Sequence, residues 1–187
     1  MTSVLMRIFR KLDHLLGVDI EKTLFYELRS EWQSSAVLPP GLKVLILEPG
    51  SLQAVESVGG TTLGEARNRI ARGDVCYCGV LAGVLVHCSW VQKSGSHPVT
   101  SAGLVENILP GEFWIYNCST VKWARGRNVY PYTLSMIVAD CFRQGFRTAR
   151  IYTTVENVAS QKGIVRAGFS LTESKRSIRF GQHYRRL

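Results

Sequence analysis

The central segment of the chain reads Val121-Lys122-Trp123-Ala124-Arg125-Gly126-Arg127-Asn128-Val129-Tyr130-Pro131. The apolar run that leads into it, Phe113 to Val121, predicts a buried strand, and the proline is typical of the first turn of a helix. A helix N-terminus leaves backbone N–H groups without partners and carries the positive end of the helix dipole. With Lys122, Arg125 and Arg127 beside these groups, the segment predicts a site for an anion such as a phosphate.

A second strand and a second helix are predicted after this turn. The first helix has one apolar face, formed at helical spacing by Tyr130, Leu134, Ile137, Val138, Cys141 and Phe142. Asn128 is its expected N-cap and Gly145 its expected stop. Residues 148–155 then predict a strand, and residues 157–168 a helix with Asn157 as its cap. This order gives a right-handed crossover unit, and anionic ligands favour the carboxyl ends of its strands.

Three segments of this unit resemble the acyl-CoA-binding core of the GNAT superfamily of N-acyltransferases. They read Arg125-Gly126-Arg127-Asn128-Val129-Tyr130, Asn157-Val158-Ala159-Ser160 and Ala167-Gly168-Phe169. The family's loop pattern is Arg/Gln-x-x-Gly-x-Gly/Ala, and a later Asn leads, eleven residues on, to Gly-Phe. Arg125 matches the first position of the loop, and Asn157 with Gly168-Phe169 matches the second spacing.

The chain departs from the family pattern at three positions. Asn128 stands where the loop has its first glycine, and Tyr130 stands where it has a second small residue. Asn tolerates a positive φ, whereas Tyr adds bulk near the expected pyrophosphate. Ile164 occupies the position where many members place a tyrosine general acid, so the leaving thiolate needs another proton source.

The remaining elements follow the order expected of the GNAT fold. We predict a strand over 42–47, helices over 51–58 and 62–71, hairpin strands over 75–81 and 84–91, a loop over 93–102, and a final hairpin or edge strand over 170–187. The expected fold class is α/β (α+β), a GNAT fold with a central mixed, mostly antiparallel sheet flanked by helices. We expect it to span residues 38–187 as one domain. An N-terminal helical extension over 1–37, including a helix over Ile20–Trp32, precedes it.

The start of the chain has an amphipathic pattern. Between Ser3 and Leu16 the apolar residues share one side of a helix, while Arg7, Arg10 and Lys11 lie elsewhere. These charges and the lack of a small-residue cleavage site argue against a secretory signal. Two interpretations stay open: a helix docked on the body or on a second copy in a homodimer, and a helix that lies on a membrane through residues 4–16.

Composition favours an anionic ligand without naming it. The chain has 187 residues, 45% of them hydrophobic and 20% charged, and a net charge of +9. That surplus suits coenzyme A, an acidic glycan, a nucleic acid or a membrane surface. Few aromatic residues accompany the basic residues near the C-terminus, which argues against nucleic-acid stacking.

The five cysteines, Cys76, Cys78, Cys88, Cys118 and Cys141, lie inside apolar runs and form no CxxC pair. A zinc site could in principle use Cys76, Cys78, Cys88 and His87 as ligands, but free cysteine most often packs as a small hydrophobe. We therefore predict no metal site and a reducing, cytoplasmic location, with peripheral membrane contact as a further option.

The resemblance implies an acyltransferase that uses acetyl-CoA as co-substrate. The acceptor, an amine or a hydroxyl on an amino sugar, another small molecule or a peptide, attacks the thioester directly. The resemblance places these residues around acetyl-CoA: Cys118, Ser119, Thr120, Val121, Lys122, Arg125, Gly126, Arg127, Asn128, Val129, Tyr130, Asn157 and Ser160.

The candidate catalytic residues are Glu112, His87 and Ser160. Glu112 and His87 are candidates to take a proton through water, and Ser160, Tyr116 or bulk water can replace the missing tyrosine. A second function class stays open: a non-catalytic acyl-CoA-binding module, or a degenerate GNAT fold that contacts a protein or a membrane. The departures at Asn128, Tyr130 and Ile164 favour that class.

Overall fold

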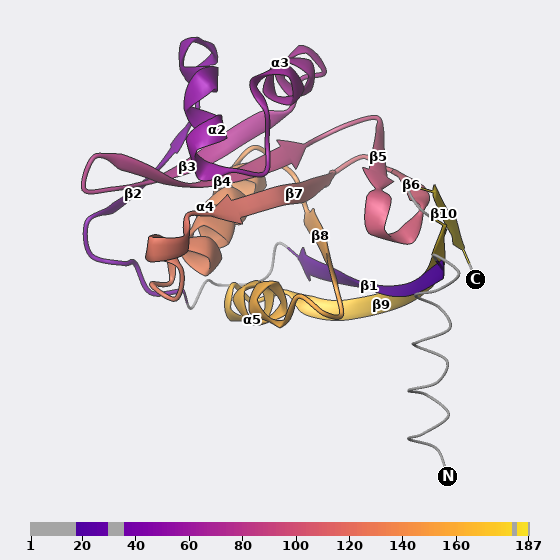
Figure 1. The fold of residues 1–187 in the computed structure, drawn as a ribbon. Helices are drawn as coiled ribbons and strands as arrows, with labels where there is room; N and C mark the ends of the chain where they lie inside the picture. Colours follow the sequence, from indigo (N-terminus) through magenta and orange to yellow (C-terminus); the bar gives the residue numbers. More distant parts are fainter. Residues whose placement is uncertain (1–17, 30–35, 181–182, 187) are drawn as a thin grey trace.

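The computed structural model describes residues 18–29, 36–180 and 183–186. Its main sheet has eight strands in the order β10-β9-β1-β8-β7-β4-β3-β2 (Figure 1). The strands are β1 (Val18–Arg29), β2 (Leu42–Ile46), β3 (Val75–Leu81), β4 (Val84–Gln92), β7 (Glu112–Thr120), β8 (Thr148–Thr154), β9 (Ser170–Phe180) and β10 (His183–Arg186). The pair β7 and β8 is parallel, and the other neighbours are antiparallel. The predicted mixed, mostly antiparallel sheet is confirmed.

Helices cover both faces of this sheet. On one face, α4 (Val129–Arg143) and α5 (Val158–Arg166) enclose the largest core cluster, in which Leu134, Ile137 and Ile164 pack against Phe113 and Ile115. On the other face, η1 (Pro49–Ala54), α2 (Val55–Val58) and α3 (Leu63–Ala71) cover an apolar cluster of β3 and β4. The described part of the chain is therefore a three-layer α/β structure.

A small hairpin completes the second face. It consists of β5 (Ser96–Val99), η2 (Thr100–Ala102) and β6 (Leu104–Asn107), and it packs on Phe25 and Trp114 of the main sheet. The predicted loop over 93–102 is therefore wrong for residues 96–102. Four residues are too few for an alternating pattern to stand out, and Pro98 weakens the strand signal further.

The helix predicted over Ile20–Trp32 is also wrong, because residues 18–29 form β1. This strand pairs with β8 on one side and with β9 on the other. Its residues alternate between faces: Leu24 and Tyr26 join the core under α4 and α5, whereas Phe25 joins the cluster under β5 and β6. Residues 18–29 of the predicted helical extension thus form a strand of the sheet. The amphipathic segment 3–16 lies outside the described residues.

The local signals at helix ends were mostly correct. Thr62 caps α3 in a full capping box with Glu65, and the Asn157 side chain accepts a hydrogen bond from the Ser160 N–H at the start of α5. Gly145 follows α4 in a left-handed conformation, with φ of 95°. Among the described residues, no helix is long and apolar enough to cross a membrane.

Candidate functional site

An opening in the sheet lies between β7 and β8. The two strands pair from Glu112 with Thr148 to Ile115 with Ile151, and beyond these pairs they diverge (Figure 1). Cavities line the region beyond the last pair. Main-chain groups in the second half of β7 are therefore available to a ligand on the β8 side.

A β-bulge lies in β7 beside this opening. The register between β4 and β7 shifts by one residue, so that Ser89 alone faces the two residues Asn117 and Cys118. Asn117 takes a left-handed φ of 47°, and its side chain Nδ2 donates to the carbonyl of Gly60 and to the hydroxyl of Thr61, both at 2.8 Å. A bulge interrupts the ladder and redirects main-chain groups. Here it places the backbone of Asn117 and Cys118 at the opening.

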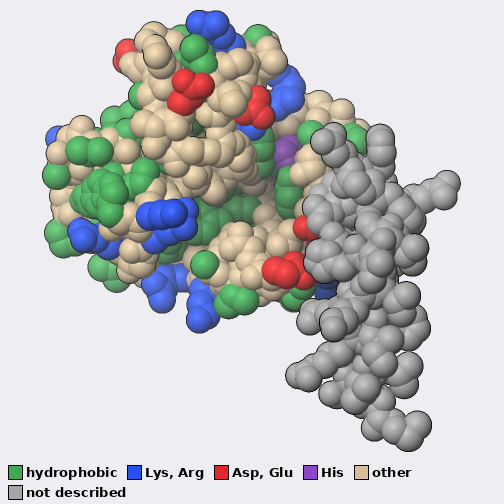
Figure 2. All heavy atoms as spheres, in the orientation of Figure 1, with side chains coloured by type: hydrophobic (Ala, Val, Ile, Leu, Met, Phe, Trp, Pro, Cys, Tyr) green, Lys and Arg blue, Asp and Glu red, His purple; other side chains and the backbone are tan. Residues whose placement is uncertain are grey.

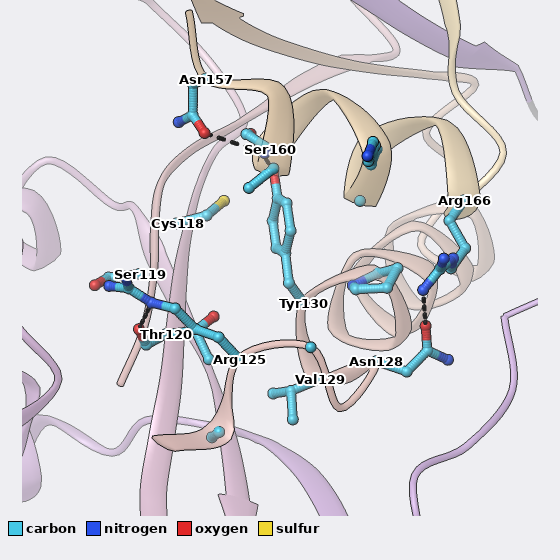
Figure 3. A pocket seen from close by; sticks show the side chains of 16 residues that line it. Cys118, Ser119, Thr120, Arg125, Asn128, Val129, Tyr130, Asn157, Ser160 and Arg166 are labelled. Carbon is cyan, nitrogen blue, oxygen red and sulfur yellow. Dashed lines mark hydrogen bonds between the residues drawn. The ribbon is translucent and has the colours of Figure 1, made fainter. Parts of the chain in front are cut away.

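A cavity of about 470 Å³ lies between the end of β7, the loop before α4, and α5 (Figure 3). We call it the loop cavity. Its lining residues are Cys118, Ser119, Thr120, Ala124, Arg125, Gly126, Asn128, Val129, Tyr130, Pro131, Asn157, Ala159, Ser160, Lys162, Gly163 and Arg166. Three of them are cations and none is acidic. In Figure 2, Lys and Arg side chains gather beside the hollow on this face. The loop cavity therefore suits an anion.

The first turn of α4 opens toward the loop cavity without a side-chain cap. Asn128 occupies the N-cap position, as predicted, but with a left-handed φ of 62° and no capping hydrogen bond. Its side chain instead donates to the Val37 carbonyl at 2.6 Å and accepts from Arg166 at 3.5 Å. The conformation is the one that glycine adopts most easily, and Asn is among the few other residues that tolerate it. Backbone N–H groups at the helix start are thus left to a ligand.

Arg125 is held at the mouth of the loop cavity. Its Nε donates a hydrogen bond of 2.9 Å to the carbonyl oxygen of Thr120, at the end of β7. This bond fixes the guanidinium beside Thr120, against the end of β7 (Figure 3). A guanidinium carries five N–H donors, so four of them stay available after this contact.

The bulk of the Tyr130 side chain, expected near the pyrophosphate, does not fill the loop cavity. Its ring runs from the start of α4 toward α5, and its hydroxyl lies 3.3 Å from the Ser160 hydroxyl (Figure 3). It packs on Gly163, where an added Cβ would stand 2.5 Å from Cδ1 of the ring. A glycine within a helix costs about 1 kcal/mol relative to alanine. The close approach of the Tyr130 ring explains why a glycine is present here.

Gly163→Ala is expected to lower the free energy of unfolding by about 2 kcal/mol, because the new methyl group overlaps the Tyr130 ring. In a Tyr130→Ala background the same change is expected to raise it by up to about 1 kcal/mol, since the overlap is gone and alanine favours the helix. Urea denaturation of the four proteins in this cycle measures both values. An equal effect of Gly163→Ala in the two backgrounds would contradict this packing.

Two further cavities continue from the loop cavity across the opening. The central cavity, about 250 Å³, shares Cys118, Tyr130, Asn157 and Ser160 with the loop cavity. The α3 cavity, about 370 Å³, shares Tyr116, Asn117 and Tyr152 with the central cavity. Its other lining residues are Glu65, Asn68, Arg69, Arg72, His97, Pro98 and Thr100. The three cavities adjoin in a row that leads from the basic loop, past the bulge, to α3.

A buried carboxylate holds two of the residues that line the α3 cavity, Arg72 and Tyr116. Asp74 is 4% exposed, forms an ion pair with Arg72 at 2.5 Å and accepts a hydrogen bond from the Tyr116 hydroxyl. Arg72 also donates to this hydroxyl at 3.1 Å. Burial, and then the bond to Asp74, raise the pKa of Tyr116, so its hydroxyl stays protonated at neutral pH.

Of the three predicted catalytic residues, the structure brings Ser160 to the cavities and not the other two. His87 is fully buried: its Nδ1 lies 2.7 Å from the Thr120 hydroxyl and its Nε2 lies 2.7 Å from the Ser89 hydroxyl. Burial lowers the pKa of His87 to about 3. Glu112 lies at the far end of β7, where it accepts from the Leu109 N–H. Neither lines any of the three cavities.

Ten of the thirteen residues predicted around acetyl-CoA line the loop cavity; Val121, Lys122 and Arg127 do not. Arg127 instead packs over the Trp123 ring, 5.9 Å from its centre. Lys162, Gly163 and Arg166 of α5 also line the loop cavity and were not predicted from the sequence. The helical spacing of Ala159, Gly163 and Arg166 on one face was the signal available for finding them.

Three of the cysteines lie together without His87. The three are Cys76, Cys78 and Cys88, buried in the apolar cluster under α2 and α3. The sulfur of Cys78 lies 3.9 Å from that of Cys76 and 3.8 Å from that of Cys88. Within the described chain they form a group that could ligate a metal. The His87 ring belongs to the opposite face, where it contacts Tyr130. The four-residue zinc set considered from the sequence is therefore not assembled.

Comparisons with known proteins show the fold. No protein-family model and no curated protein matches the sequence. Among solved structures, a GCN5-related N-acetyltransferase from Sphaerobacter thermophilus matches 95% of this chain and 56% of its own, with 16% identity and a TM-score of 0.64. An acetyltransferase of the GNAT family from Colwellia psychrerythraea matches 92% of this chain and 60% of its own, with 14% identity and a TM-score of 0.59.

A third structure is a GCN5-related glucosamine N-acetyltransferase region of a fungal multi-domain β-N-acetylglucosaminidase. It matches 94% of this chain and 23% of its own, with 10% identity and a TM-score of 0.59. The chain thus spans little more than half the length of the first two structures. The chain has the fold of the GCN5-related N-acetyltransferases, as the motifs around Arg125 and Asn157 predicted.

Proposed function

We propose that the protein is an acetyltransferase that binds acetyl-CoA in the loop cavity and central cavity and transfers the acetyl group to an amine or a hydroxyl. The observation that carries this proposal is the opening between β7 and β8, which joins a basic, acid-free cavity at an uncapped helix start to a second cavity on the far side of the sheet. Such a passage lets two substrates meet at the bulge from opposite sides.

The pyrophosphate of coenzyme A would lie at the start of α4. Backbone N–H groups of the first helical turn and the helix dipole favour a negative charge there. Arg125, Lys162 and Arg166 line the same cavity and supply side-chain charge. Because this site is made mainly of main-chain groups, Asn128 serves it as well as the glycine of the family pattern.

The pantetheine arm would run along β7 between Cys118 and Thr120. On the β8 side this part of β7 lies beyond the last recorded strand pair, so its main-chain groups can pair with the amides of the arm. Acetyl-CoA supplies the acetyl group as an activated thioester. A backbone N–H at the Asn117–Cys118 bulge would polarise the thioester carbonyl.

Tyr130 is the proposed proton donor to the leaving thiolate. Its hydroxyl lies beside Ser160 where the loop and central cavities meet, and burial raises its pKa well above the ordinary value, so that it is protonated at neutral pH. Ile164, at the family's tyrosine position, is fully buried in the core and cannot serve. The missing tyrosine is thus replaced from the neighbouring helix.

The acceptor would enter through the α3 cavity and attack the thioester directly. Positioning of two bound reactants alone can lower a barrier by about 7–11 kcal/mol, so no covalent acyl-enzyme is required. D-Glucosamine is the first acceptor to test, because one protein of the same fold acts on glucosamine. A cytoplasmic location and a homodimer remain part of this proposal.

Thiol release decides between the enzyme and a non-catalytic module. Purified protein is incubated with acetyl-CoA and, in turn, D-glucosamine, methylamine and a short peptide with a free N-terminus, while released CoA thiol is followed by a colorimetric reagent. We expect acceptor-dependent thiol release. Binding of acetyl-CoA by calorimetry without thiol release from any acceptor would favour the module, and no binding would contradict both.

Arg125→Ala is expected to weaken acetyl-CoA binding about tenfold or more, because charge-assisted hydrogen bonds contribute about 1.5–3 kcal/mol. Arg143→Ala is the matched control, since it removes the same side chain from the exposed far end of α4. Isothermal titration at two salt concentrations measures both. Equal affinities for the two variants would remove Arg125 from the proposed site.

A further inference from the structure

His97 carries a buried ring nitrogen without a partner. The residue is 1% exposed, and its Nε2 is one of three buried side-chain nitrogens that have no hydrogen-bond partner within the described residues, with the indole nitrogens of Trp90 and Trp114. The two tryptophans line none of the three cavities, whereas His97 lines the α3 cavity. An unpaired buried polar atom costs about 1–3 kcal/mol, and a ligand in this cavity would provide its partner.

The hydrogen bonds around His97 determine which nitrogen carries the proton. Its Nδ1 lies 2.8 Å from Oε1 of Gln92. The amide nitrogen of Gln92 donates to the carbonyls of Ser94 and Ser96, both at 3.0 Å, which orients the amide with its oxygen toward the ring. An amide oxygen only accepts, so Nδ1 must be the protonated nitrogen. Nε2 therefore presents a lone pair.

Burial and the neighbouring arginines keep the His97 ring neutral. It stacks on Trp114 of β7 at 5.0 Å between ring centres, and Tyr152 of β8 lies 5.8 Å away. Arg69 of α3 and Arg72 just after it repel a second proton, while Asp74 alone attracts one. Burial, followed by Arg72, lowers the pKa of His97 to about 4. The lone pair is therefore free throughout the physiological pH range.

The position of His97 matches the path of the acceptor. Its ring centre lies 4.8 Å from that of Tyr116, which lines both the α3 cavity and the central cavity. The bulge residue Asn117 lines both cavities as well. An acceptor nitrogen that enters through the α3 cavity toward the bulge thus passes His97.

We propose that Nε2 of His97 is the general base that takes the proton of the acceptor amine. This role rests on the acetyltransferase function proposed above. As the nitrogen of R–NH₂ forms its bond to the acetyl carbon, the C–S bond breaks and its electron pair goes to sulfur. One N–H proton passes to Nε2, and the thiolate takes a proton from the Tyr130 hydroxyl. The imidazolium then releases its proton to solvent, from which Tyr130 regains one, so that R–NH–CO–CH₃ and CoA–SH are the net products.

Two substitutions separate this role from a structural one. His97→Asn keeps a donor to Gln92 in the place of Nδ1 but removes the acceptor at Nε2. His97→Gln places an amide oxygen near Nε2, which can accept a hydrogen bond but cannot take a proton. Both are expected to lower kcat with methylamine at least 100-fold, the scale of a lost general base, and to leave the Kd for acetyl-CoA unchanged. The KM for methylamine should rise in His97→Asn alone.

A second amine provides a readout that a structural role would not move. In 2,2,2-trifluoroethylamine the fluorines make the N–H protons far more acidic during attack, so solvent water can take the proton without help from a protein base. The loss caused by His97→Asn should shrink to a few fold with this acceptor. Equal losses with both amines, or no acceleration of thiol release by methylamine in the wild type, would overturn the proposal.

Nitrogen NMR of the histidine rings gives a test that needs no turnover. One ring, identified by its absence in His97→Asn, should show a protonated Nδ1 and an unprotonated Nε2 from pH 8 down to pH 5. A protonated Nε2 in that range would overturn the proposal even if the protein is an acetyltransferase. If the wild-type protein instead fails to bind acetyl-CoA in calorimetry, the proposed function fails, whatever the tautomer of His97.

Discussion

Lowering the pH from 7 to 5 is expected to reduce the free energy of unfolding by about 4 kcal/mol, because two buried histidines stay neutral in the folded state. Burial lowers the pKa of His87 to about 3 and that of His97 to about 4. In the unfolded chain a histidine has a pKa of about 6.5. Between these values the unfolded state binds protons that the folded state does not. The contribution of the two rings to the free energy of unfolding is therefore complete above pH 6.5. It is lost as the pH falls toward 4 for His97 and toward 3 for His87.

Urea denaturation at pH 7, 6 and 5 measures this loss. His97→Asn is the internal control, because it removes one of the two titrating rings and should roughly halve the slope of stability against pH. A free energy of unfolding that stays constant between pH 7 and pH 5 would show that the rings are not held neutral. It would also contradict the hydrogen-bond arrangement assigned to His97.

Tyr130→Phe is expected to lower the rate of acetyl transfer about 100-fold while leaving acetyl-CoA affinity within a few fold. The phenylalanine ring keeps its packing on Gly163, so the fold and the cavity shape are preserved. Only the hydroxyl next to Ser160 is lost. With it goes the proposed proton donor to the thiolate, so the effect should appear in kcat and not in binding.

Tyr132→Phe is the matched control for this substitution, since Tyr132 lies on the same helix and lines none of the three cavities. Thiol release is measured for both variants with two substrates: acetyl-CoA, and an acetyl thioester whose leaving thiol is more acidic than that of CoA. An acidic thiol needs less help from a proton donor, so the loss in Tyr130→Phe should become smaller. A loss that is the same for both leaving groups would assign Tyr130 a structural role.

The loop and both crossover helices were predictable because their signals are local. Helix start and stop residues, an apolar face at helical spacing and a basic turn all lie within a few residues of one another. Asn157 and Gly145 act as predicted. The family pattern singled out Arg125 and the later Asn157, which lie on two sides of the loop cavity in the folded chain.

The strand β1 was missed because its pattern fits two structures. Leu24, Tyr26 and Leu28 alternate as a strand requires, yet the wider stretch to Trp32 also satisfies helical spacing. Pairing with β8 and β9, whose paired residues lie at least 119 positions later, decides between them. Local propensity carries no information on such distant partners.

The catalytic candidates show the same limit. Glu112 and His87 were candidates because the sequence placed them in the predicted central strand and in the strand adjacent to it. In the structure Glu112 lies at the far end of β7 and His87 is fully buried. His97 lies in a segment expected to be an irregular loop, and its free nitrogen depends on the orientation of Gln92. Only the folded arrangement shows which histidine meets a cavity.

Amide chemical-shift mapping with acetyl-CoA tests the central claim most directly. Coenzyme A bound in the proposed place should perturb the amides of residues 118–120 and 126–130 and those at the start of α5, and leave β9 and the exposed face of α3 unchanged. The same titration of Arg125→Ala should show these shifts only at higher ligand concentration. Perturbations that cluster elsewhere, or none at all, would contradict the assignment of the loop cavity to acetyl-CoA.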